Sequence, residues 1–145
     1  MFLFKKKEKE QKVVYLDIDG VFNALSVLDP NNRVLISHDW GTWQISNENV
    51  EFLKYLDYNC KCMWISTWLE ESNEINKFIG IKPFEFVQFS KKSEIIDQIK
   101  SKKLKKGLII DDELTTTVVD YIQPNPATGL DEKDRKNIKK WLENE

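Results

Sequence analysis

The sequence is poor in residues that mark several common classes of protein. Its two cysteines, Cys60 and Cys62, are too close for an ordinary disulfide and too few for a zinc set, so both thiols are expected to be reduced. No run of about 18 apolar residues is present, which argues against a membrane-spanning helix. Arginine occurs only at Arg33 and Arg135. A phosphate site would therefore depend on lysine, backbone amides or a metal.

Charge and composition indicate one globular domain. The formal net charge is -2, so bulk electrostatics do not favour nucleic acid as a partner. With 145 residues and 41% hydrophobic content, the chain is expected to form a single domain over residues 1–145. The first residues, MFLFKKKEKEQK, have their apolar and basic parts in the wrong order for a secretory signal. We expect a cytoplasmic protein, with residues 1–12 as a basic extension.

Short apolar runs alternate with helical patterns, which predicts an α/β fold. The alternation favours a Rossmann-like parallel sheet of about five strands with helices on both faces. The expected strands cover residues 13–17, 62–66, 84–89, 107–111 and 118–123. A turn at DPNN and a strand at RVLIS predict a small flap or hairpin within residues 24–45, and no large cap domain.

Four segments carry apolar residues at helical spacing. The expected helices and their inward residues are one capped by Ser46 (Val50, Leu53, Leu56), one from about Glu70 to Gly80 (Ile75, Phe78, Ile79), one capped by Ser93 (Ile95, Ile96, Ile99) and one after Asp131 (Ile138, Trp141, Leu142).

Two acidic residues follow the first apolar run, in VVYLDIDGVFN. Because side chains alternate along a strand, Asp17 and Asp19 should point the same way. Clustered carboxylates need a compensating cation, most simply Mg²⁺. Gly20 then allows a sharp turn and a close approach to a ligand.

Two further strand ends carry polar residues. LIIDDE places Asp111 and Asp112 after another apolar run, and parallel strands bring their carboxyl ends to one edge of the sheet. MWISTW ends in Ser66 and Thr67, whose hydroxyls are neutral donors suited to a phosphate oxygen. The sequence therefore predicts a combined metal and phosphate site at this edge.

The chain resembles the haloacid dehalogenase-like (HAD) phosphohydrolase superfamily over nearly its whole length. The resemblance rests on four motifs in order, namely DIDGV, ISTW, a lysine and IIDD. More narrowly it resembles the small uncapped HAD domains found alone in bacteria and in multifunctional RNA-repair proteins. The resemblance implies that Asp17 is a nucleophile forming an aspartyl phosphate, and that Asp19 protonates the leaving oxygen and activates water. It implies Mg²⁺ held by Asp17, Asp112 and the backbone carbonyl of Asp19, with Asp111 orienting the site or sharing the metal. By position, Ser66 matches the family's catalytic hydroxyl.

The lysine of the family pattern falls within FSKKSE. Lys92 is preferred as the catalytic lysine because it adjoins Ser93, and Lys91 is the alternative. Lys91, Thr67 and Gly20 are the candidate substrate-binding residues.

The resemblance implies a Mg²⁺-dependent phosphomonoesterase whose substrate is a small phosphoester or a nucleic-acid end. Two other functions stay open: a non-catalytic phosphate- or metal-binding module, and a phosphotransferase on a small phosphoester. Intact paired acids argue against the first. Asp19 disfavours dehalogenation, because a departing halide needs no proton. No membrane partner and no particular oligomeric state is predicted.

Several rings lie in or near the expected flap. Phe22, Trp40, Trp43 and Trp68 could stack on a base at the mouth of the site, although core packing is the commoner role of each. His38, the single histidine, falls in the flap, where it could touch substrate, although a surface loop residue is the expected role. The lysine-rich residues 100–106 precede a strand and should lie at the opposite edge of the sheet.

Overall fold

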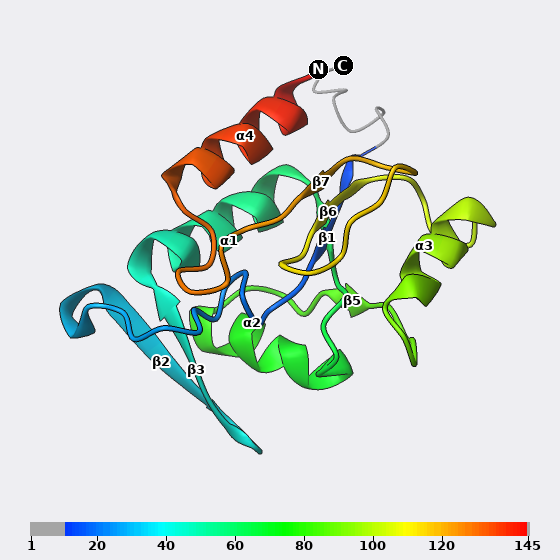
Figure 1. Cartoon of the computed structure of the whole chain (residues 1–145). Helices are drawn as coiled ribbons and strands as arrows, with labels where there is room; N and C mark the ends of the chain where they lie inside the picture. The colour runs from blue at the N-terminus through cyan, green and yellow to red at the C-terminus, as the bar shows by residue number, and fades with distance from the viewer. Residues whose placement is uncertain (1–10, 145) are drawn as a thin grey trace, which may run out of the picture.

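The centre of the fold is a five-stranded sheet in which every neighbouring pair is parallel, in the order β5-β4-β1-β6-β7 (Figure 1). A computed structural model describes residues 11–144, so most of the expected extension over residues 1–12 lies outside the described residues. The strands are β1 (Val13–Leu16), β4 (Lys61–Trp64), β5 (Glu85–Phe86), β6 (Leu108–Ile110) and β7 (Tyr121–Ile122). The predicted α/β fold with a parallel sheet is therefore confirmed.

The two edge strands are shorter than predicted. β5 ends at Phe86, three residues before the predicted end at residue 89, and β7 begins at Tyr121, three residues after the predicted start at residue 118. Phe86 pairs with Trp64, the last residue of β4, and Ile122 pairs with Ile110, the last residue of β6.

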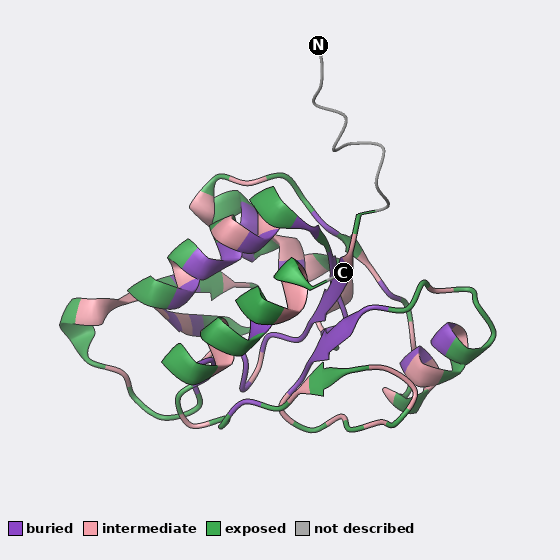
Figure 2. Ribbon diagram, turned by 90° about the horizontal axis from the view of Figure 1, so that it is seen from above, coloured by how far each residue is buried: buried purple, intermediate pink, exposed green. Residues whose placement is uncertain are grey.

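Helices flank both faces of the sheet, and two hydrophobic clusters separate by strand alternation. The helices are α1 (Asn47–Asn59), α2 (Asn73–Ile79), α3 (Ser93–Lys100) and α4 (Glu132–Glu143). Val14 and Leu16 of β1 join residues of α1, α2 and α4 in one cluster, whereas Val13 and Tyr15 join residues of α3 in the other. Figure 2 shows the buried strands in the middle, with α3 alone on one side. No helix within residues 11–144 is long and apolar enough to cross a membrane.

Local sequence signals set most helix ends. The Ser46 side chain accepts from the Asn49 amide and begins α1, and Gly80 ends α2 in the left-handed conformation. Asp131 forms a capping box with Asp134 at the start of α4. The expected cap at Ser93 is wrong: Ser93 is the first residue of α3 and Lys92 occupies the cap position.

The expected burial of Phe78 is also wrong, since its side chain is 55% exposed. The inner face of α2 is occupied by Ile75 and Asn76, and Asn76 accepts a hydrogen bond from the Trp64 indole at 3.0 Å. Phe78 follows Asn76 by two residues, about 200° around a helix, and so points outward. The Trp64 indole also donates to Asn73 at 3.1 Å, so two polar residues of α2 lie on the face that meets the sheet while Phe78 lies on the other.

The expected flap is an antiparallel hairpin made of β2 (Arg33–His38) and β3 (Gly41–Ser46). A short 3-10 turn over Pro30–Asn32, capped by Asp29, precedes it. The hairpin extends past the carboxyl ends of the sheet strands and lies beside α2 (Figure 1). No large cap domain accompanies it within the described chain.

Candidate active site

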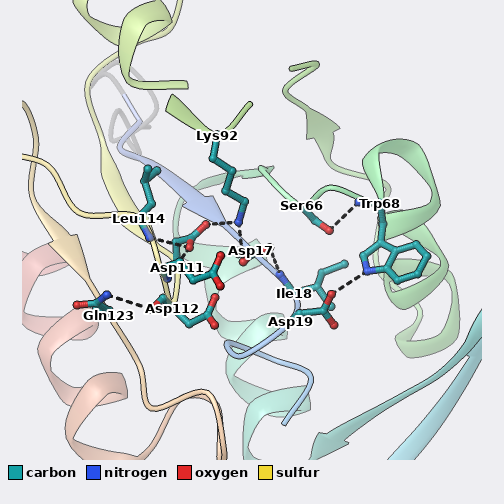
Figure 3. A network of polar contacts seen from close by, with 11 residues as sticks. Asp17, Ile18, Asp19, Ser66, Trp68, Lys92, Asp111, Asp112, Leu114 and Gln123 are labelled. Carbon is teal, nitrogen blue, oxygen red and sulfur yellow. Dashed lines mark hydrogen bonds and ion pairs between the residues drawn. The ribbon is translucent and has the colours of Figure 1, made fainter. Parts of the chain in front are cut away.

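Three neighbouring strands bring the predicted site residues to one edge of the sheet. Asp17 directly follows β1, Asp111 directly follows β6, and Ser66 lies two residues after β4. The ladder continues past the strand ends, because the Asp17 amide donates to Ile110 at 3.0 Å and the Ile65 amide donates to Leu16 at 2.8 Å. These main-chain bonds fix where the side chains begin, and Figure 3 shows the polar network that they form.

Asp17, Asp111 and Asp112 form an acidic cluster, with one oxygen of each lying within 4.8 Å of the others. Asp17 is 5% exposed and Asp111 is fully buried. The Lys92 ammonium lies against both of them: its Nζ is 2.8 Å from Oδ2 of Asp17 and also contacts Oδ2 of Asp111. Three carboxylates face one ammonium, so the four groups, when all are ionised, have an excess of negative charge.

The two aspartates after β6 have different surroundings. Asp111 uses Oδ2 for Lys92, while its Oδ1 accepts from the amides of Glu113 at 2.8 Å and Leu114 at 3.0 Å. Both of its oxygens are therefore engaged by the protein. Asp112 is partly exposed on the open side of the cluster, where it can meet a ligand.

The charges of the cluster perturb its ionisation. Burial first, and then the charge of Asp111, raise the pKa of Asp17 to about 7, although Lys92 acts to lower it. Burial alone would lower the pKa of Lys92, but the charges of Asp17 and Asp111 and their hydrogen bonds outweigh it, so this pKa is raised. Burial, followed by Asp111 and Glu113, raises the pKa of Asp112. A cation at the cluster would relieve the repulsion.

The residues present fit a hard divalent cation. Carboxylate oxygens are the ligands that Mg²⁺ prefers, and three of them converge here with too little positive charge to balance them. Gly20 allows this arrangement: its φ is +80°, and a Cβ at that position would lie 2.5 Å from Cγ of Asp112. The expected close approach at Gly20 is thus an approach to the Asp112 side chain.

Asp19 and Ser66 flank the cluster. The Asp19 side chain is not among the three clustered carboxylates of the described chain; it accepts instead from Asn23 at 2.8 Å and from the Trp68 indole at 3.0 Å. Ser66 is buried, and its Oγ accepts from the Trp68 amide at 3.0 Å. Because Oγ acts as the acceptor in that bond, the Ser66 hydroxyl keeps its own hydrogen for donation.

Two candidates lie outside the network. Lys91 is exposed, and its carbonyl caps the following turn by accepting from the Glu94 amide, whereas Lys92 reaches the acids. Thr67 is exposed and takes part in no hydrogen bond found among residues 11–144. Geometry thus places Lys92, Ser66, Asp17, Asp111 and Asp112 together without Lys91 or Thr67.

The rings near the flap are mostly internal. Phe22 and Trp43 are buried, so neither is available to a substrate, and Trp40 is 78% exposed at the hairpin turn. The expectation for His38 is wrong: its side chain is only 4% exposed and stacks on Trp43 with ring centroids 4.0 Å apart. Sequence reasoning assigned no role to Asn23. The sequence gives little indication of its role, because the turn after Gly20 is what brings the Asn23 side chain to Asp19.

Two surface hollows lie away from the acidic cluster, one of about 440 Å³ beside α1 and α4 and one of about 510 Å³ beside β7. Neither is lined by Asp17, Asp111, Asp112 or Lys92, and the clustered aspartates of the described chain lie at the sheet edge, so the chemistry of the edge site is the stronger guide to function. No protein-family model matches the chain, and no curated protein matches it.

Proposed function

We propose that this protein is a Mg²⁺-dependent phosphomonoesterase of the HAD-like type, acting through an aspartyl phosphate. The observation that carries the proposal is the meeting of Asp17, Asp111 and Asp112 with Lys92 at the carboxyl edge of a parallel sheet. Asp17 and Asp112 would hold the metal, while Asp111 would orient Lys92, which it contacts, and is itself fixed by the amides of Glu113 and Leu114. When bound, Mg²⁺ would neutralise charge on the phosphate and on the carboxylates.

The proposed first step transfers the phosphoryl group to Asp17. A carboxylate oxygen of Asp17 attacks phosphorus, and the bond from phosphorus to the leaving oxygen breaks while Asp19 gives that oxygen its proton. Lys92 lies 2.8 Å from Asp17 and would offset the charge of the incoming phosphate. The Ser66 hydroxyl would donate to a phosphate oxygen.

The second step releases phosphate. Asp19, now a carboxylate, takes a proton from a water molecule whose oxygen attacks phosphorus. The bond between phosphorus and the Asp17 oxygen breaks, so Asp17 is again a carboxylate and inorganic phosphate leaves. The two acids therefore divide the work: Asp17 carries the phosphoryl group and Asp19 moves the proton.

The test is phosphate release from p-nitrophenyl phosphate by the full chain, with Mg²⁺ and with excess EDTA. Asp17→Asn should lower turnover by about a thousandfold or more, because the amide is a poor nucleophile. Asp97→Asn is the matched control, since Asp97 is exposed on α3. Wild-type turnover by Asp17→Asn would refute the mechanism.

A nucleotide or a nucleic-acid terminal phosphate is the proposed substrate class. The hairpin extends beside the site edge and presents Trp40, 78% exposed, on which a base can stack. A panel of nucleotides, terminally phosphorylated oligonucleotides, sugar phosphates and phosphopeptides would rank the classes by kcat/KM. Mg²⁺ binding without turnover of any of them would favour the non-catalytic module instead.

A further inference from the structure

Both side-chain oxygens of Asp19 are held by uncharged donors. Oδ1 accepts from Nδ2 of Asn23 at 2.8 Å. Oδ2 accepts from Nε1 of Trp68 at 3.0 Å (Figure 3). Rotating the carboxylate away from this orientation would break at least one of these bonds. Asp19 therefore has a defined direction that does not depend on Lys92 or on the acidic cluster.

The Asn23 donor is itself held by the hairpin. Its Oδ1 accepts from the Gln44 amide of β3 at 2.8 Å. The Gln44 amide can only donate, and the Asp19 carboxylate can only accept. The Asn23 side chain therefore has one orientation, with Oδ1 toward Gln44 and Nδ2 toward Asp19. The Asn23 carbonyl also accepts from the Gly20 amide at 2.8 Å, which ties the turn after Asp19 to the same residue.

The Trp68 donor is held by the hairpin as well. Its ring meets the His38 ring edge-on with centroids 4.6 Å apart, and the Trp43 ring edge-on at 5.7 Å. His38 belongs to β2 and Trp43 to β3, so Trp68 packs against both strands. The Trp68 amide also donates to Ser66, which links the hairpin to the proposed phosphate-binding hydroxyl.

We propose that Trp68 and Asn23 are positioning residues for Asp19 and that hairpin β2–β3 exerts its effect on the reaction through them. The inference rests on the proposed function, because it assigns these residues to the proton transfer of Asp19. Losing a positioning bond weakens proton donation to the leaving oxygen and leaves the attack by Asp17 in place. Substrates whose leaving group departs readily without a proton are then affected least.

The test is the dependence of kcat/KM on the leaving group, measured for a series of aryl phosphates and an alkyl phosphate. This quantity reports phosphoryl transfer from the free substrate, even where release of phosphate limits kcat. Trp68→Phe keeps a ring against the hairpin and removes the indole donor. It should lower kcat/KM for the alkyl phosphate about tenfold more than for p-nitrophenyl phosphate. Asp19→Asn should lower kcat/KM for the alkyl phosphate relative to p-nitrophenyl phosphate by a larger factor still.

Trp141→Phe is the matched control, because the Trp141 indole also donates to an aspartate, Asp120, at 2.8 Å, and no part of the site includes it. In this control, kcat/KM should depend on the leaving group as it does in the wild type. Asn23→Ala is the second variant and removes the other hydrogen bond to Asp19. Thermal melts followed by circular dichroism show whether each variant folds. Equal losses for all leaving groups in both Trp68→Phe and Asn23→Ala would overturn the inference while Asp17→Asn stays inactive. Full activity of Asp17→Asn would overturn the proposed function, and the inference with it.

Discussion

Replacing Lys92 by methionine tests whether this lysine compensates the acidic cluster. The substitution keeps a side chain of similar length but removes the ammonium that bonds Asp17 at 2.8 Å and contacts the fully buried Asp111. Removing one partner of a buried ion pair costs about 3–5 kcal/mol. Asp111 keeps two amide hydrogen bonds, which compensate part of the loss. We therefore expect the free energy of unfolding at pH 8 to fall by about 3 kcal/mol, or roughly 10 °C in Tm.

The same variant should show a characteristic pH dependence. The pKa of Asp17 is already about 7, and losing the Lys92 charge that lowers it raises it further. Above about pH 7 the folded variant therefore keeps a proton that folded wild type loses, so the stability of the variant falls further than that of wild type as pH rises. The deficit relative to wild type should be small near pH 4 and largest above pH 7.

Urea unfolding in EDTA, followed by circular dichroism, measures these differences in the free energy of unfolding. Lys91→Met is the matched control: Lys91 is the adjacent lysine but is exposed, and its loss should change stability by less than about 0.5 kcal/mol. The reasoning fails if the two variants are equally stable, or if the Lys92→Met deficit does not grow with pH.

Two further substitutions test the metal and phosphate contacts. Gly20→Ala places a Cβ against Asp112 and should weaken Mg²⁺ binding, measured by calorimetry, about tenfold; Gly80→Ala has nearly the same φ, +82°, with nothing within 4 Å, and should leave binding unchanged. Ser66→Ala should lower kcat for p-nitrophenyl phosphate about a hundredfold by removing a buried donor, whereas the exposed Thr67→Ala should stay near wild type. Equal Mg²⁺ affinities of Gly20→Ala and Gly80→Ala would contradict the proposed metal site. Equal kcat values of Ser66→Ala and Thr67→Ala would contradict the proposed phosphate contact.

Much of the fold follows from short-range patterns. The strands at β1 and β6 are buried apolar runs, and the caps at Ser46 and Asp131 act on amides three residues away, so each signal is local. The wrong prediction for Phe78 involves a partner that is distant in the sequence. Phe78 faces outward while the inner face of α2 holds Ile75 and Asn76, and Asn76 bonds the Trp64 indole twelve residues earlier in the chain.

In the candidate site, too, some contacts can be predicted from the sequence and others depend on how the chain packs. Parallel topology predicts that Asp17 and Asp111 meet, since each follows a strand of one sheet. The choice of Lys92 over Lys91 depends on the direction in which the chain enters α3, and no spacing rule determines that direction. Trp68 follows the hydroxyl motif directly, but its link to Asp19 depends on the packing of a hairpin formed by other residues.

Asp17 and Asp19 have different surroundings although they lie two residues apart. Asp17 is buried beside an ammonium and two further carboxylates, so its charge depends on cations, as suits a nucleophile that receives an anionic group. Asp19 contacts only uncharged donors, Asn23 and Trp68, among the hydrogen bonds of the described chain. The hydrogen bonds from Asn23 and Trp68 orient the Asp19 carboxylate without placing a cation beside it. One intervening residue, Ile18, separates the two carboxylates in sequence, and the strand end and the hairpin give them different partners.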